Sequence, residues 1–328
     1  GKSDKNLEDF DVLVFANRYI REITIPPSIK HISSYAFCNC SHIYEVKFHK
    51  DSQIRTIGHN AFAESSIFNI TIPNSVEIIG KSAFQSCYNL NEVCIEKGSK
   101  LKSISNTLFD SCCLLTKVQI PENSELQSIC TYSFYLTNIE RLYIPSNVEV
   151  IEECWCRNTD NLTEVEISPN NRNFKYGDEE HHIILGKNDN NSEDFDVLVF
   201  ACRKINEITI PPSVKRIPPF SLCCNSLKKI NFSEDSELLS IEESSIESKS
   251  LESIYIPSKV EILENNWINN AINLVNITVS PKNRNFKVLN QQILIGKSEI
   301  NSEKYDVLIL ASKNIKEAFI PSYIKIIS

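Results

Sequence analysis

The chain has 328 residues, of which 41% are hydrophobic and 23% are charged, and its formal net charge is −8. This composition is typical of a soluble folded protein, and the negative charge argues against nucleic acid or an anionic membrane as the main partner. Only seven glycines are present, so a nucleotide-binding fold built on glycine-rich turns is disfavoured.

The chain opens on a stretch that recurs twice further along. Each copy contains a Gly-Lys pair, a polar loop and an apolar run, as in GKSDKNLEDFDVLVFA at the start. Two apolar, β-rich runs around a polar loop predict a β-hairpin. The predicted hairpin inserts cover residues 1–19, which hold only part of one, 168–204 and 280–314.

The Gly-Lys pairs of these stretches look like the end of a phosphate-binding loop. Such a loop needs a second glycine five positions before the pair. Those positions hold His181 and Gln291, and no helical pattern follows either pair. The sequence therefore predicts a structural turn and no nucleotide site.

A shorter pattern recurs between and beyond the hairpin stretches. It reads apolar-x-x-apolar-x-apolar and often ends in proline, as in IREITIP (Ile20 to Pro26) and LESIYIP (Leu251 to Pro257). Twelve copies begin at residues 20, 43, 67, 90, 115, 139, 162, 205, 227, 251, 274 and 315. The steps are 22 to 25 residues, except for two of 43 and 41 residues that contain the hairpin stretches. A fixed period of this size indicates a repeat architecture.

Each copy is followed by a second fixed piece, whose fullest form is SVEIIGKSAFQSC (Ser75 to Cys87). Alternate strand residues point to opposite faces, so Ile70 and Ile72 are expected inside, and Pro73 ends the strand because it lacks an amide donor. Residues 83–84 are expected to form one turn of helix over the core. No single unit can bury its apolar face alone, but stacked units can, which predicts a solenoid with a parallel sheet.

The LxxIxIPxSVxxIxxxAFxxC unit resembles the leucine-rich repeat, and more closely its treponeme-type, BspA-like subfamily. The resemblance covers essentially the whole chain. It implies an α/β repeat fold: a single curved, right-handed solenoid over residues 1–328, dominated by strands, with the parallel sheet on its concave side and hairpin inserts between groups of rungs. Because the sequence has no methionine, we expect it to be an excerpt of a longer chain.

Twelve cysteines are the most conspicuous reactive side chains. Cys40, Cys87 and Cys112 share one repeat position, three residues after a phenylalanine, and are expected to form a buried column of small residues. The close cysteine pairs lack the spaced second pair of a structural zinc site, so no metal is predicted, while disulfides stay open if the protein is secreted. No nucleophile elbow or HExxH motif occurs, so neither an enzyme nor a cofactor is expected.

The outward strand positions on the concave sheet are the expected binding surface, because repeat proteins use such faces for recognition. Tyrosine and arginine are enriched at binding hot spots. The candidate concave-face residues are Lys117, Arg141, Tyr143, Glu164, Glu166 and Tyr255. The loops Lys187 to Asp194 and Lys297 to Lys304 are further candidates because they project from a regular rod. A solvated sheet without a ligand remains the alternative for the concave face.

BspA-like proteins are largely surface proteins tied to adhesion, in bacteria and in trichomonad and amoebal protists. The resemblance therefore implies a non-catalytic module, at the cell surface or secreted, that binds a protein of host tissue, other cells or matrix. Self-association through exposed solenoid ends is a further option. The alternative is a cytoplasmic scaffold that bridges protein partners, which unpaired buried cysteines would favour.

Overall fold

The computed structural model describes residues 1–4, 10–189, 191–299, 302–313, 315, 317 and 319–327. The chain divides into two compact units, Gly1–Asn173 and Phe174–Ser328. The predicted hairpin inserts include residues 5–9, 190, 300, 301 and 314, which lie outside the described residues. The loops predicted to project likewise contain residues 190, 300 and 301.

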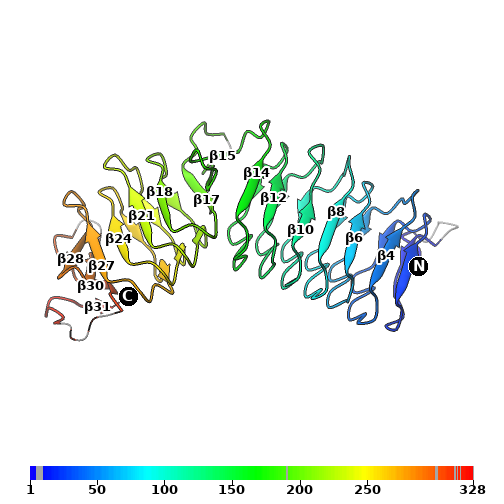
Figure 1. Ribbon diagram of the computed structural model, residues 1–328, viewed down its shortest axis with the longest axis horizontal. Helices are drawn as coiled ribbons and strands as arrows, with labels where there is room; N and C mark the ends of the chain where they lie inside the picture. The colour runs from blue at the N-terminus through cyan, green and yellow to red at the C-terminus, as the bar shows by residue number, and fades with distance from the viewer. Residues whose placement is uncertain are drawn as a thin grey trace. The chain divides into compact units, whose positions relative to one another are not determined.

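Unit 1 is built on a seven-stranded parallel sheet whose strands follow one another in chain order (Figure 1). Its strands are β2 (Glu22–Ile25), β4 (Glu45–Phe48), β6 (Asn69–Ile72), β8 (Glu92–Ile95), β10 (Lys117–Gln119), β12 (Arg141–Ile144) and β14 (Glu164–Ile167). Short second strands pair in parallel in two further rows: β1 (Val12–Leu13), β3 (His31–Ile32), β5 (Thr56–Ile57) and β7 (Ile78–Ile79), then β9 (Ser103–Ile104), β11 (Ser128–Ile129) and β13 (Val150–Ile151).

Unit 2 repeats this arrangement with fewer rungs. Its main parallel sheet contains β18 (Glu207–Ile210), β21 (Lys229–Phe232), β24 (Ser253–Ile256) and β27 (Asn276–Val279). A second sheet contains β15 (Phe174–Tyr176), β16 (Ile183–Gly186), β17 (Val197–Ala201), β19 (Arg216–Ile217), β22 (Ser240–Ile241) and β25 (Ile262–Leu263). Two smaller sheets contain β20 (Leu222–Cys223), β23 (Ile246–Glu247) and β26 (Ile268–Asn269), and β28 (Phe286–Leu289), β29 (Ile293–Gly296), β30 (Val307–Ala311) and β31 (Ile326–Ile327).

Eleven of the twelve predicted repeat copies form these main strands, each beginning two residues into its copy. The twelfth copy, from residue 315, contains residues 316 and 318, which lie outside the described residues. In β6, Ile70 and Ile72 are 2% and 1% exposed, whereas Asn69 and Thr71 face solvent. The predicted alternation of strand residues is therefore confirmed.

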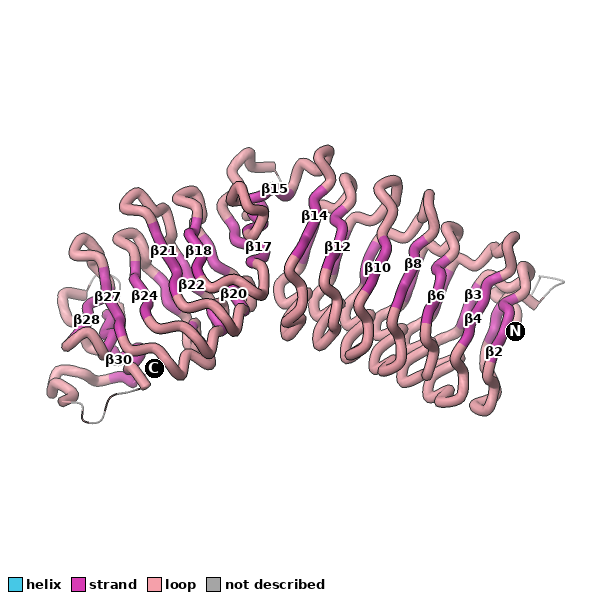
Figure 2. Tube along the Cα trace, viewed as in Figure 1, coloured by secondary structure: helices cyan, strands magenta, loops and turns pink. Residues whose placement is uncertain are grey.

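The helical turn expected at residues 83–84 was wrong, and with it the α/β class. Figure 2 shows strands and loops but no helix among the described residues. Ser82 and Ser86 have φ angles of 57° and 55°, and a left-handed residue at every fourth position breaks a right-handed helix. The amides of Ser82, Phe84 and Ser86 donate to carbonyls of the next rung, at 2.8 to 3.1 Å, instead of to their own segment. These turns therefore stack as another ladder.

A column of phenylalanine rings fills the core of unit 1 behind the sheet. Phe37, Phe62, Phe84, Phe109 and Phe134 are at most 1% exposed. Successive rings stack with centroids 4.8, 5.2, 5.8 and 5.6 Å apart. Each ring inside the column thus packs against both neighbouring rungs, so the column couples the rungs as the backbone ladders do.

The glycine of the Gly-Lys pair has a packing role in unit 2. β15 and β16 are antiparallel neighbours, and Gly186 lies opposite Phe174. A Cβ on Gly186 would lie 2.7 Å from Val199 Cγ2 and 3.2 Å from the Phe174 ring. A Cβ on Gly296 would be similarly close to the side chains of Ile309 and Phe286. These glycines therefore allow a strand to pass directly under an aromatic ring.

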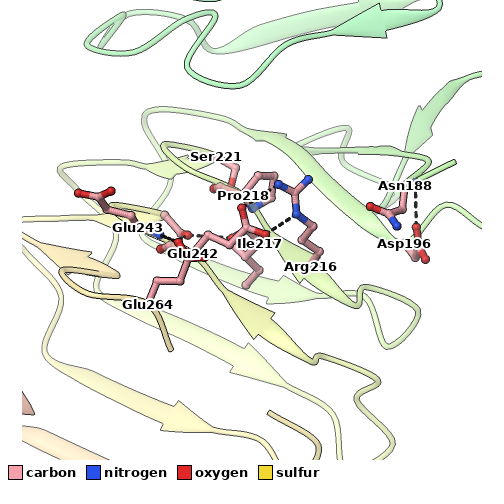
Figure 3. Close-up of polar contacts among 10 residues, drawn as sticks. Asn188, Asp196, Arg216, Ile217, Pro218, Ser221, Glu242, Glu243 and Glu264 are labelled. Atoms are coloured by element: carbon pink, nitrogen blue, oxygen red, sulfur yellow. Dashed lines mark hydrogen bonds and ion pairs between the residues drawn. The ribbon is translucent and has the colours of Figure 1, made fainter. Parts of the chain in front are cut away.

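In each hairpin stretch, the residue after the Gly-Lys pair is hydrogen-bonded to an aspartate at the far end of the loop. Asp306 is buried and Asp196 is partly buried. In the last copy, Ser298 donates its amide and hydroxyl to Asp306 at 3.0 and 3.1 Å. In the middle copy, the Asn188 amide donates to Asp196 at 3.2 Å (Figure 3). Figure 3 also shows the ion pair of Arg216 with Glu242 on the neighbouring rung. The loop is thus closed at its base by a serine or asparagine and an aspartate.

We expect Phe84→Ala to lower the free energy of unfolding by about 3–5 kcal/mol, because it leaves a cavity between two stacked rings. Urea denaturation followed by circular dichroism measures this change. Phe68→Ala is the matched control, since Phe68 is 53% exposed, and should change stability by about 0.5 kcal/mol or less. Equal losses in both variants would contradict a role for the ring column.

We expect Ser298→Ala to raise the pKa of Asp306. The Ser298 amide and hydroxyl bonds hold that pKa below its ordinary value in the folded protein. A carboxyl group whose pKa is lower in the folded than in the unfolded protein stabilises the fold. This stabilisation is fully present above the pKa of the unfolded state, near pH 4, and is lost as the pH falls through the pKa of the folded state. The variant should therefore lose stability relative to wild type above about pH 4, and the two should converge in acid.

An NMR titration of the Asp306 carboxyl carbon measures the pKa directly. Ser302→Ala is the control, because Ser302 lies in the same loop and its hydroxyl binds the Lys304 backbone instead of Asp306. An Asp306 pKa that is the same in all three proteins would overturn the assignment.

Candidate functional site

Five of the six candidate residues lie together on three adjacent strands of unit 1, β10, β12 and β14. Lys117, Arg141 and Glu164 are register partners in one row across these strands, and Tyr143 and Glu166 are partners in the next row. All five side chains point to the outer face, and Tyr143 is half-buried. We call these five residues the cationic row face.

The inner side of the same strands holds the face in place. Val118, Leu142 and Val165 alternate with the outward residues and are 6%, 2% and 2% exposed. Burying three aliphatic side chains fixes the register, since a slip by one residue would turn them outward. The outward side chains are therefore presented from a rigid backbone.

Lys117 and Arg141 are direct neighbours on the sheet, although like charges in this position repel. Each has a glutamate on its far side: Lys117 Nζ lies 2.9 Å from Glu92 Oε1, and Arg141 Nε lies 3.1 Å from Glu164 Oε2. The bond from Lys117, with a second from Gln119, holds the pKa of Glu92 below its ordinary value. Across four adjacent strands, the row therefore has the order acidic, basic, basic and acidic side chain.

The cationic row face lines a groove of about 480 Å³. The arginine side chain is 77% exposed and the lysine 59%, so both cations keep most of their surface open to a partner despite their ion pairs. Exposed ion pairs contribute little to stability, about 0–1 kcal/mol each. The arrangement can therefore exchange an internal carboxylate for one on a partner at small cost.

Tyr255 is not brought together with the other five candidates. It lies on β24 in unit 2, in a groove of about 370 Å³ that is also lined by Lys229, Asn231, Asn276 and Thr278. Lys229 Nζ binds Glu207 at 3.1 Å. The two units therefore present separate outward faces of similar construction.

Glu92 and Gln119 adjoin the cationic row face, and Glu92 contacts its Lys117, but neither was among the predicted site residues. Gln119 donates to Glu92 across the strand pair, and Glu92 also binds Lys117. Both residues occupy outward repeat positions, so their phase could have placed them on the face. Which neighbour each side chain contacts depends on rotamers, which the repeat pattern does not specify.

The predicted cysteine column is confirmed as buried, since Cys40, Cys87 and Cys112 are 0% exposed. Burial raises the pKa of the Cys112 thiol well above its ordinary value, and its Sγ donates to the Phe84 carbonyl at 3.0 Å. The three side chains pack as small buried groups. Across the described ranges, no group of three or more His, Cys, Asp or Glu side chains could hold a metal ion.

A sequence model of the BspA type leucine rich repeat region, with six copies, matches residues 8–123, 55–177 and 189–294. These matches cover well over half of the chain. The protein belongs to the BspA-type leucine-rich repeat family. A comparison with curated proteins finds no match.

Three solved structures share the fold. A leucine rich cell surface protein from Faecalibacterium prausnitzii is 21% identical, with a TM-score of 0.60 over 81% of this chain and 74% of that one. The pneumococcal vaccine antigen PcpA is 21% identical, with a TM-score of 0.56 over 82% and 64%. A leucine-rich repeat protein from Eubacterium ventriosum is 21% identical, with a TM-score of 0.60 over 74% and 62%.

At this identity the likeness establishes the leucine-rich-repeat solenoid, here built from strands and turns. The match spans less than two thirds of the PcpA and Eubacterium ventriosum chains.

Among the residues that the structure describes, no helix has the length and apolar character to cross a membrane. Solenoids of this kind typically serve as scaffolds for protein recognition.

Proposed function

We propose that this chain is a non-catalytic recognition module of a cell-surface BspA-type protein and mediates adhesion to host cells, other cells or matrix. The observation that carries the proposal is the cationic row face: an exposed arginine and lysine, side by side on a rigid sheet with a half-buried tyrosine in the next row. The description of one structural relative as a cell surface protein and of another as a vaccine antigen supports the location.

The face indicates the chemistry of its partner. A partner carboxylate that approaches between Lys117 and Arg141 would relieve their mutual repulsion, and the Tyr143 ring offers flat apolar surface beside it. Glu164 and Glu166 would repel a uniformly acidic partner. The face is therefore complementary to a protein surface with an acidic side chain, an apolar contact and a basic neighbour.

A second candidate function is an intracellular scaffold that bridges protein partners. One observation favours it: Cys40, Cys87, Cys112 and Cys224 are buried as free thiols. Buried thiols persist in reducing compartments, whereas secreted chains more often pair them. The two candidate functions differ in the compartment, and they share the use of an exposed sheet face.

We expect Arg141→Ala and Tyr143→Ala each to weaken binding by at least about tenfold, since hot-spot truncations cost about 2 kcal/mol or more. Purified chain is titrated onto monolayers of epithelial cells and onto coats of fibronectin, laminin and collagen. Lys229→Ala is the control, because Lys229 holds an equivalent outward position in unit 2 and pairs with Glu207. Binding that all three variants retain in full would exclude the face as the adhesive site.

Protease shaving of intact cells that express the full-length protein tests the compartment. The adhesion proposal predicts that peptides from this chain are released into the medium while cytosolic markers stay inside. The scaffold alternative predicts protection until the cells are lysed. Protection under conditions that release a known surface protein would overturn the adhesion proposal.

A further inference from the structure

An aromatic ring flanked by lysines recurs at the base of the hairpin loops. The distances from lysine Nζ to the ring centroid are 4.2 Å for Lys287 and 5.2 Å for Lys297 over Tyr305, 4.6 Å for Lys175 and 5.1 Å for Lys187 over Phe195, and 5.1 Å for Lys2 over Phe10. The two rings in unit 2, Phe195 and Tyr305, are half-buried. Such contacts attract a cation to the face of the ring.

Strand register assembles the cluster around Tyr305 from three segments. Lys287 lies opposite Ile295 in the antiparallel pair of β28 and β29, and Lys297 follows β29 directly. Tyr305 precedes β30, and its hydroxyl donates to the Arg284 carbonyl at 3.0 Å. The Nζ atoms of Lys287 and Lys297, from different segments, therefore both lie within 5.2 Å of the centroid of one ring. We call Lys287, Lys297 and Tyr305 the Tyr305 cluster.

The charges of the Tyr305 cluster are not neutralised. Over the described residues of unit 2, no carboxylate lies within 4.0 Å of Lys287, Lys297 or Arg284, whereas Lys259 and Lys325 each have one. Lys287 and Arg284 are exposed. In a chain of net charge −8, two unpaired lysines around one ring form a local positive site, which attracts an anion.

We propose that the Tyr305 cluster binds the sulfate groups of a sulfated polysaccharide. Lysine is a compact point charge with three rotatable donors, which suits a tetrahedral oxyanion, whereas arginine favours the planar fork of a carboxylate. Two ammonium groups held around one ring can engage successive sulfate groups of an extended polymer. The site is separate from the cationic row face and does not depend on it.

The neighbouring charges favour this copy of the cluster over the one around Phe195. The turn between β15 and β16 carries Asp178, Glu179 and Glu180, and the corresponding turn between β28 and β29 carries only Asn290, Gln291 and Gln292. Glu299 and Glu303 in the following loop, and Asp306 directly after Tyr305, are the acidic groups that oppose the ligand. The Tyr305 cluster is therefore expected to bind more tightly than the Phe195 one.

The test uses the purified chain and a fluorescent, heparin-derived dodecasaccharide, with binding measured by anisotropy at two salt concentrations. We expect binding that added salt weakens. Lys287→Gln and Lys297→Gln should each weaken it about threefold and together about tenfold, as for exposed charge pairs. Tyr305→Leu should weaken it with no change of charge, because the ring no longer positions the lysines.

Controls separate a specific site from general charge. Lys259→Gln removes the same charge from a paired lysine of unit 2 and should leave binding within about twofold. Equal weakening by this control, or equal binding of the desulfated dodecasaccharide, would overturn the site. Tighter binding of polyphosphate would overturn the proposed ligand and indicate a phosphate polymer instead. Tighter binding of polyglutamate would indicate an acidic polypeptide. Circular dichroism verifies that each variant is folded.

Discussion

The stacking of one rung on the next is the interaction on which the rest of the structure depends. Strands of successive rungs lie about 4.8 Å apart, and this single spacing serves the main sheet, the short second strands and the stacked turns alike. The aromatic column follows a similar repeat, with successive ring centroids 4.8 to 5.8 Å apart. A rung removed from its neighbours loses all of these contacts together, so stability in each unit is collective.

The hairpin stretches interrupt this regular stacking and change what the chain can present. Phe200 lies opposite Ile184 of β16 and is 1% exposed, whereas Phe15 at the equivalent position of the first copy is 64% exposed. The aspartates at the loop bases accept hydrogen bonds from donors of their own loops, and Asp196 and Asp306 also pair with Lys215 and Lys325 of the next rung. A regular core can therefore carry loops of varied charge.

The repeat pattern predicted the strands, the inward isoleucines and the buried cysteine column, because each depends on the two-residue alternation or on one conserved spacing within this chain. The helical turn failed for a local reason: AF in SAFQSC suits a helix by composition, but the left-handed Ser82 and Ser86 turn the amides toward the next rung. The Tyr305 cluster was not predicted either. Its members are separated by loops, and only strand register brings them together.

The two candidate binding surfaces differ in how their charges are held, and this difference separates their roles. On the cationic row face, Lys117 and Arg141 already have glutamate partners on adjacent rungs, so a protein partner must exchange contacts and specificity comes from shape and the tyrosine. Around Tyr305, the ring holds two ammonium groups that have no carboxylate within ion-pair distance in the described part of unit 2. An anion there gains attraction without displacing an internal partner. We therefore propose that the hairpin provides long-range attraction and that the sheet provides selective contact.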